Sequence, residues 1–299
     1  MSKKFMDLTF NFNFKPLDEK DINCPKNLIY RPYNSEDEKM LLMQLNSMKD
    51  EKEISKDFVN FIDDFVKNCV VNNDNEEVVK LLPKMSYINK LWLFLLIRSK
   101  SKSNIVKKNI KCENMVEKSS KIENGDAYKT ECGFDNEYKI DIENDIKLIN
   151  DISGKQETLD LPKDGSKIDF VLTIPSFKAL ADIFEVKALL EKNIDGLNDE
   201  SKKAYVEKVQ KKSAEVIFAF IKRMVINHEG KNELYNEDDL ADMGIDEFYR
   251  FTKSIPGGLN SITSILFSKL PSFVIDKTIK CKSCGQETNI KHEGIVDFF

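Results

Sequence analysis

The sequence predicts an α+β protein, with two helical lobes around a small antiparallel β centre. Apolar residues recur every three or four positions in residues 36–100 and again in 175–280, which is the period of a helix packed on one face. Residues 101–174 instead carry β-branched residues, alternating patterns and turn signals. The 299 residues are 41% hydrophobic and have a formal net charge of −5, as expected for a globular protein rather than a disordered one.

These changes of pattern divide the chain into five segments. They are an extended N-terminal arm (1–35), an N-terminal helical lobe (36–100), a small β region that holds the first cysteine pair (101–174), a C-terminal helical lobe (175–280) and a cysteine-containing tail that docks on the β region (281–299).

The arm is expected to contain a strand with one apolar face. Leu8, Phe10, Phe12 and Phe14 alternate with polar residues. We favour pairing of this face within the chain's own fold. The alternative is addition to the sheet of a neighbouring protein, for which Phe10 and Phe12 are the candidate partner-binding residues.

The N-terminal lobe is expected to bury one stripe of a helix, in which Cys69 is a core thiol rather than a ligand. A second helix should run from about residue 87 to 99 and carry Trp92. Its apolar run, residues 91–97, is far shorter than the roughly 20 residues that cross a bilayer, so we expect no membrane span and no secretion. The buried stripe is Phe58, Phe61, Ile62, Phe65 and Cys69.

The β region should form a small antiparallel sheet, with one strand ending at Cys112 and a turn at residues 162–165. The side chains expected on its inner faces are Tyr138, Ile140, Ile142, Ile168, Phe170 and Leu172.

The C-terminal lobe is expected to begin at Pro175 and Ser176. Its strongest helix prediction covers residues 198–227, where apolar side chains recur at spacings of three and four. Asn236 should cap the following helix and Gly244 should end it. A Pro-Gly-Gly break follows at 256–258.

The cysteines form the most informative motif. Cys281 and Cys284 flank two residues and are followed by Gly285, a spacing that can hold one metal ion in a tight knuckle turn. One pair supplies two ligands, whereas a structural zinc site needs four. In a cytosolic protein such close thiols favour a metal over a disulfide, and no βαβ unit surrounds them to suggest a redox motif.

A second pair repeats the same pattern. Ile-Lys-Cys ends at Cys112 as it does at Cys281, Cys-Gly begins at Cys132 as it does at Cys284, and an apolar-Lys pair follows at the same distance. A polar insertion, residues 113–131, separates the first two cysteines. The sequence therefore predicts a zinc-ribbon-like site with Cys112, Cys132, Cys281 and Cys284 as ligands. His292 in place of Cys112 is an alternative.

Catalytic signatures are missing from the sequence. It contains two histidines, of which His228 is expected at a helix end, and it has no Gly-rich phosphate loop and no hydrolase or metalloprotease motif. A four-cysteine zinc is coordinatively closed and structural. We therefore expect no enzyme and no small-molecule substrate, although an enzyme with an unrecognised site would show a deep pocket with convergent polar groups.

A nucleic-acid-binding or transcription-accessory zinc ribbon is the alternative function. The net charge of −5 argues against it, because phosphate neutralisation supplies most of such affinity. The lysines that it would use are Lys100, Lys102, Lys107, Lys108 and Lys111.

The order of motifs resembles the T4-like bacteriophage baseplate protein family. The matching stretches are LWLFLLIRSKS, DFVLTIPSF, IDEFYRFTKSIPGG, SKLPSFV and CKSCGQETNIKHEGIVDFF. Members are implicated in assembling the central hub of a contractile tail, where a compact first Cys-x-x-Cys would be expected instead of the split pair found here. The resemblance implies a non-enzymatic assembly protein that binds other tail proteins, in the virion baseplate or in the host cytoplasm during assembly.

The terminal GIVDFF carries two further candidate contacts, Phe298 and Phe299. If exposed, they would make an apolar patch for a partner. Packing on the protein's own zinc lobe is the equal alternative.

Overall fold

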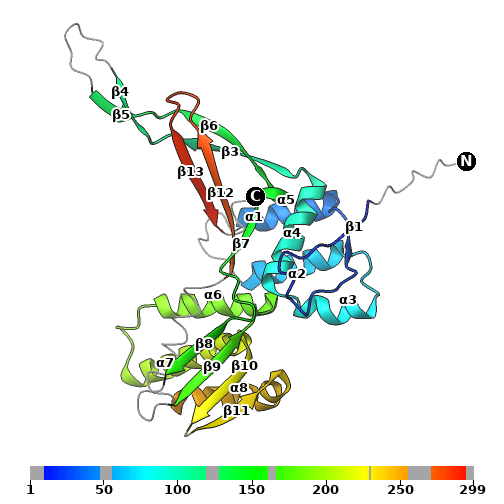
Figure 1. Ribbon diagram of the computed structural model, residues 1–299, viewed down its shortest axis with the longest axis vertical. Coiled ribbons are helices and arrows are strands. Elements are labelled where there is room, and N and C mark those ends of the chain that lie inside the picture. Colours follow the sequence, from blue (N-terminus) through cyan, green and yellow to red (C-terminus); the bar gives the residue numbers. More distant parts are fainter. Residues whose placement is uncertain are drawn as a thin grey trace, which may run out of the picture. The chain divides into compact units, whose positions relative to one another are not determined.

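The computed structural model describes residues 10–47, 56–118, 128–160, 166–228, 230–254 and 271–293. They are helices and small antiparallel sheets, which confirms the predicted fold class (Figure 1). The chain divides into two compact units. Unit 1 is Met1–Ile97 with Asn150–Pro271, and unit 2 is Arg98–Ile149 with Ser272–Phe299. The five-segment division stays a prediction.

Helices dominate the described part of unit 1, and the last of the N-terminal helices, α4, runs on into unit 2. No helix among the described residues is both long enough and apolar enough to cross a membrane. The helices are α1 (Ser35–Ser47), α2 (Lys56–Cys69), α3 (Glu76–Leu81), the 3-10 turn η1 (Leu82–Lys84), α4 (Tyr87–Ser101), α6 (Phe177–Glu191), α7 (Asp199–Ala219) and α8 (Glu237–Ser254).

The N-terminal strand pairs within its own fold, as favoured from the sequence. Strand β1 (Phe12–Asn13) pairs with β2 (Ile29–Tyr30), and the ring centroids of Phe12 and Tyr30 are 5.7 Å apart. Phe14 is buried, whereas 63% of Phe10 is exposed. Leu8 lies outside the described residues.

Helices α2 and α4 supply much of the core of unit 1. The predicted stripe of α2 is buried at Phe58, Ile62 and Phe65, and Phe65 meets Phe94 of α4 edge-on at 5.4 Å between ring centroids. Cys69 is fully buried, and this burial raises the pKa of its thiol to about 12. Cys69 is therefore a core thiol, as expected.

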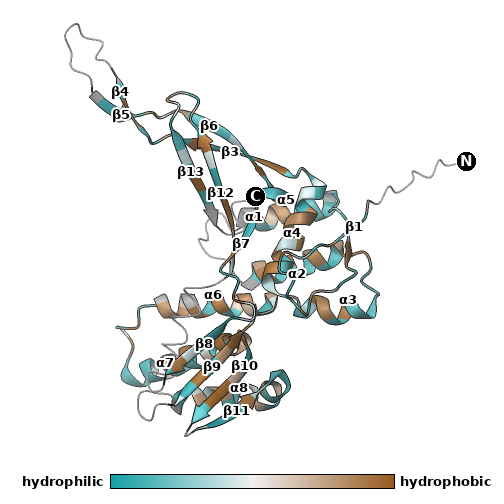
Figure 2. Ribbon diagram, viewed as in Figure 1, coloured by the Kyte–Doolittle hydropathy of each residue, from teal (hydrophilic) through white to brown (hydrophobic). Residues whose placement is uncertain are grey.

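A four-stranded sheet in unit 1 has the order β11-β10-β9-β8, and β9 and β10 are hydrophobic along much of their length (Figure 2). Ile168, Phe170 and Leu172 are buried on one face of β9, which confirms their predicted alternation. The strands are β8 (Gln156–Asp160), β9 (Lys167–Leu172), β10 (Ile221–His228) and β11 (Lys231–Tyr235).

The helix predicted over 198–227 is wrong in its last eight residues. Helix α7 ends at Ala219, and the chain continues as β10. The β10–β11 turn contains Gly230 at φ 75°, a conformation that suits glycine. Phe220 and Met224 are four residues apart, which fits a helix, and both are buried. Met224 nevertheless lies on strand β10. His228 correspondingly ends β10 and not a helix.

The other boundaries of this region agree with the sequence. Ser176 is the N-cap of α6. The Asn236 side chain accepts hydrogen bonds from the backbone N–H groups of Asp238 (2.9 Å) and Asp239 (3.1 Å) at the start of α8. Gly244, at φ 67°, separates two helical stretches within α8. The predicted breaks at 162–165 and 256–258 lie outside the described residues.

Unit 2 is built from hairpins. Strand β3 pairs with β6, β4 with β5, and β12 lies between β13 and β7. The single small sheet expected for residues 101–174 is therefore wrong, because the strands of this region are divided among four separate sheets. The elements are β3 (Ile105–Lys111), β4 (Met115–Lys118), β5 (Tyr128–Glu131), β6 (Asp135–Asp141), α5 (Ile142–Asp145), β7 (Lys147–Ile149), β12 (Ser272–Lys280) and β13 (Glu287–Glu293).

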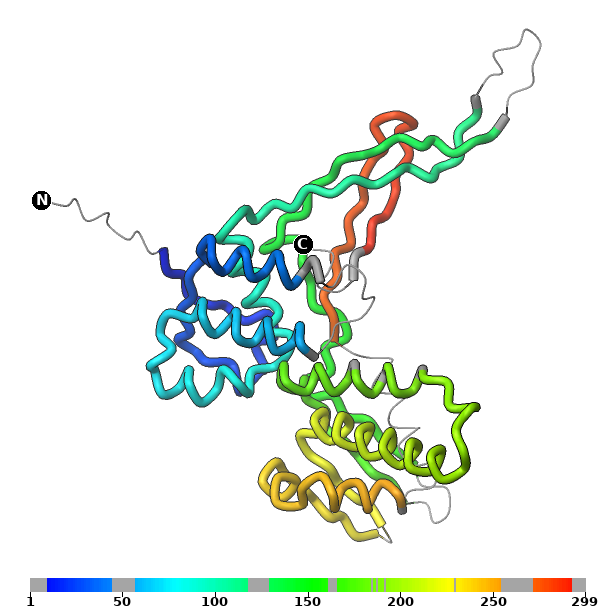
Figure 3. The backbone as a smooth tube through the Cα atoms, turned by 180° about the vertical axis from the view of Figure 1, so that it is seen from behind, coloured from blue at the N-terminus to red at the C-terminus, as the bar shows by residue number. Residues whose placement is uncertain are grey.

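Two segments far apart in sequence lie side by side in unit 2. The β12–β13 hairpin runs beside the β3–β6 ribbon in both views (Figures 1 and 3). The Lys277 ammonium of β12 bonds the Asp145 carboxylate at 2.7 Å and the Lys139 carbonyl at 2.9 Å. This placement brings the strand ends that carry the cysteines together.

Candidate metal centre

Four cysteines meet where the strands of unit 2 end. Cys112 follows β3, Cys132 follows β5, and Cys281 follows β12, with Cys284 in the next turn. Their four sulfur atoms lie within 4.8 Å of one another. The structure thus brings together the four predicted ligands, which come from both halves of the sequence.

The sulfur–sulfur distances fit a tetrahedral metal site. Cys112 Sγ lies 3.7 Å from Cys284 Sγ, and Cys132 Sγ lies 3.8 Å from Cys281 Sγ. Zinc–sulfur bonds of about 2.3 Å in a tetrahedron place the sulfurs about 3.8 Å apart. These distances are also too long for disulfide bonds, which measure about 2.05 Å. All six cysteines of the chain are free thiols.

The two knuckles have the same backbone geometry. The Gly133 N–H donates to the Cys112 carbonyl at 2.9 Å, and the Gly285 N–H donates to the Cys281 carbonyl at 2.9 Å. Both glycines lie in the left-handed region, at φ 69° and 74°. A side chain at either position would be strained, which is why Cys-Gly occurs in both pairs.

The strands that lead into and out of the knuckles also correspond. Lys111 pairs with Asp135 and Lys280 with Glu287, so each hairpin closes one residue before its first cysteine. The Cys112 N–H donates to the Phe134 carbonyl and the Cys281 N–H to the Gln286 carbonyl, both at 2.9 Å. The repeat noticed in the sequence is therefore a repeat of structure.

The insertion in the first knuckle extends the ribbon beyond the cysteines. Its described ends form β4 and β5, and the Cys132 N–H donates to the Asn114 carbonyl at 2.8 Å. In the second knuckle only two residues separate the cysteines. Both lengths produce the same cysteine–glycine turn, so the insertion is not needed to shape the site.

Asn136 is a residue of the site that the sequence did not reveal. It is 3% exposed, its Nδ2 lies 3.4 Å from Cys281 Sγ, and its Oδ1 accepts from the Lys282 N–H at 3.0 Å. Buried and exposed residues alternate along β6, and Asn136 lies on the buried face with Tyr138 and Ile140. A polar residue at a buried position needs a partner, and this was the one available signal.

The surroundings of the cysteines favour different protonation states. The backbone N–H of Cys284, aided by the Asn136 amide, lowers the pKa of the Cys281 thiol to about 6. Burial raises the pKa of the Cys112 thiol to about 11. The lowered pKa of Cys281 favours its thiolate, the form that binds metals.

The remaining predicted residues lie elsewhere. Cys24 is half-buried outside the cluster, and burial raises the pKa of its thiol to about 12. The side chain of His292, together with Phe298 and Phe299, lies outside the part that the structure describes. Of the lysines named for nucleic-acid binding, Lys100 pairs with Glu143 at 2.7 Å and Lys107 with Glu137 at 3.9 Å.

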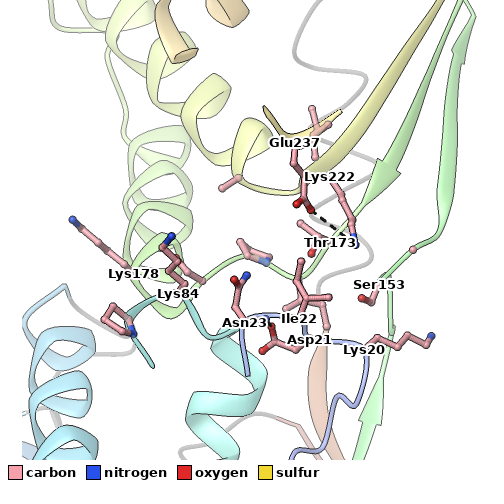
Figure 4. Close-up of a pocket in the computed structure, with 17 residues that line it drawn as sticks. Lys20, Asp21, Ile22, Asn23, Lys84, Ser153, Thr173, Lys178, Lys222 and Glu237 are labelled. Carbon is pink, nitrogen blue, oxygen red and sulfur yellow. Dashed lines mark hydrogen bonds and ion pairs between the residues drawn. The ribbon is translucent and has the colours of Figure 1, made fainter. Parts of the chain in front are cut away.

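A cavity of about 430 Å³ lies in unit 1, between residues 20–23, the segment 173–176 and the start of α8 (Figure 4). The Lys222 ammonium and the Glu237 carboxylate in its wall are 3.9 Å apart. The residues that line it include no histidine or cysteine. His228 is instead paired with Ser166, at 2.6 Å between Nδ1 and Oγ.

Comparison with known proteins identifies the family of the chain. The family described as T4 bacteriophage base plate protein matches residues 9–299. The chain belongs to this family. No curated protein and no solved structure matches it significantly. Membership of the T4 base plate family confirms the resemblance seen in the sequence and makes the chain a phage structural baseplate protein.

Proposed function

We propose that the chain is a non-enzymatic assembly protein of the baseplate hub of a contractile tail. It binds other tail proteins and holds one structural zinc ion at Cys112, Cys132, Cys281 and Cys284. The observation that carries the proposal is the meeting of four sulfurs from sequence-distant hairpins in a chain of the base plate family.

The donor set fits zinc. Four thiolates are soft ligands, they suit a tetrahedral ion without redox chemistry, and they leave no coordination position for a substrate. When bound, zinc would supply a closed structural centre. The chain's own part is to hold four sulfurs at tetrahedral spacing and to place backbone N–H groups near Cys281.

The metal would fasten two hairpins that the chain joins only through a long intervening segment. Residues 150–271, which belong to unit 1, separate the two halves of unit 2. Closing such a loop costs conformational entropy, and metal binding offsets that cost because binding and folding are coupled. The zinc therefore holds the second half of unit 2 against the first.

Binding to other tail proteins is supported by the family and by exposed apolar residues. Phe10 is 63% exposed, so it is accessible for a contact, whereas Phe12 packs on Tyr30. We retain Phe10 as the leading candidate contact of the N-terminal segment. Phe298 and Phe299 remain candidates on the sequence alone.

The test is genetic and compositional. We expect deletion of the gene from its phage to abolish infectious particles and to leave incomplete baseplates, with heads formed normally. A Cys281→Ser phage should share this defect, and Cys24→Ser is the matched control because Cys24 lies outside the cluster. Normal tails in the deletion strain would contradict the proposal. Mass spectrometry of virions and baseplate intermediates then shows whether the protein stays in the particle.

A further inference from the structure

We infer that Asn136 is a positioning residue that controls how tightly the centre retains its metal, by bonding a ligand that belongs to the other half of the chain. The inference rests on the proposed metal site. It assigns unequal roles to two knuckles whose cysteine–glycine turns have the same backbone geometry.

The contacts of Asn136 cross from one hairpin to the other. Asn136 belongs to β6, beside the first knuckle, yet its amide reaches Cys281 Sγ and the Lys282 N–H of the second. The same Nδ2 donates to the Phe134 carbonyl at 3.2 Å. With 3% of the residue exposed, these partners replace water and fix the orientation of the amide.

The structural repeat identifies the counterpart of Asn136 as Thr288. Asn136 lies opposite Ile110 in its hairpin, and Thr288 lies opposite Ile279 in the other. Thr288 Oγ1 accepts from Asn114 Nδ2 at 3.1 Å, so this position also bonds the opposite knuckle. Among the contacts of described residues, however, Asn136 has a hydrogen bond to a ligand sulfur and Thr288 has one to an amide.

This difference has a chemical consequence. Four thiolates around a divalent ion carry a net negative charge, and an N–H directed at a sulfur stabilises that charge and fixes the sulfur's position. The Asn136 amide donates to Cys281 Sγ with one end and accepts from the Lys282 N–H with the other. A carboxylate of the same shape would keep the acceptor, lose the donor and repel the thiolate.

The test compares Asn136→Asp with Thr288→Val in the full-length chain loaded with zinc or with cobalt(II). Asn136→Asp should raise the zinc dissociation constant about 10- to 100-fold, as loss of an outer-shell partner commonly does. It should also shift the sulfur-to-cobalt charge-transfer absorption, which reports electron density at the sulfurs. Thr288→Val removes a cross-knuckle bond but no bond to sulfur, so its absorption should match the wild type.

Each outcome decides the matter. Wild-type retention and absorption in Asn136→Asp would overturn the inference, and so would equal spectral shifts in both variants, which would indicate a general structural effect. If Asn136→Asp does not fold in excess zinc, Asn136→Ser decides through the same absorption band, which must shift while that of Thr288→Val does not. A wild-type chain that takes up neither metal would overturn the proposed site itself, and the inference with it.

Discussion

The described parts of the two units differ in what fills their cores. Unit 1 buries large aromatic side chains in quantity, including Phe58, Phe94, Phe177, Phe220 and Phe248. The described part of unit 2 is made of narrow hairpins and a short helix, and its core includes two of the four clustered cysteines, Cys112 and Cys281. Small units with little apolar burial commonly depend on a metal or a disulfide. One chain thus combines a unit that folds by hydrophobic burial with one that we propose needs zinc.

Metal removal should produce the largest difference between the two units. Chelation should abolish amide-exchange protection in β3, β6, β12 and β13, because structural zinc contributes about 10–16 kcal/mol of apparent binding free energy in small zinc domains. Protection in α2 and α4 up to Ile97 should persist, because apolar packing holds them. Hydrogen exchange with mass spectrometry measures both regions at once. Equal loss of amide-exchange protection in the two units would contradict the claim that only unit 2 depends on the metal.

The converse change removes apolar burial from unit 1. Phe94 is fully buried and packs on Phe65, so Phe94→Ala should lower the free energy of unfolding of unit 1 by about 3–5 kcal/mol. Denaturant titration measures the loss, and zinc content should not change. Val79→Ala is the matched control in the same unit. Val79 is 57% exposed, and its truncation should stay within about 0.5 kcal/mol.

A smaller effect is expected when a cysteine outside the cluster is replaced. Cys69 is fully buried in unit 1, and Cys69→Ser would bury a hydroxyl without an assigned partner, at a cost of about 1–3 kcal/mol. Thermal unfolding should show this loss with zinc stoichiometry intact. Zinc loss in Cys69→Ser would show that the core thiol and the metal ligands are not separate classes.

The smallest expected effect comes from shortening the first knuckle. Replacing residues 113–131 with Lys-Ser, the spacer of the second knuckle, should leave the zinc stoichiometry unchanged, because both spacers produce the same cysteine–glycine turn. Elemental analysis of the purified variant checks it. Loss of zinc would show that the β4–β5 ribbon contributes to the site.

In both units the sequence could predict local features better than tertiary ones, for a physical reason. The four cysteines were identifiable because knuckle turns impose a local pattern, Ile-Lys-Cys and Cys-Gly, that survives a long insertion. The buried stripe of α2 was identifiable because its period is that of a helix. Both signals depend on neighbouring residues alone.

The sequence predictions failed where contacts with residues distant in sequence determine the local structure. Phe220 and Met224 keep a helical spacing, yet Met224 pairs with Phe170 in a strand, and that partner is remote in sequence. Asn136 looks like an ordinary polar residue until Cys281 is placed beside it. Strand partners and buried polar contacts are set by tertiary structure, which a local pattern does not encode.

The measurement that tests the central claim most directly is the metal content of the purified chain, by elemental analysis and native mass spectrometry, for wild type, Cys132→Ser and Cys281→Ser. We expect one zinc per chain in the wild type and none retained in either variant, since the two residues lie in different halves of one centre. A zinc-free wild type, or full zinc in Cys132→Ser, would contradict the account.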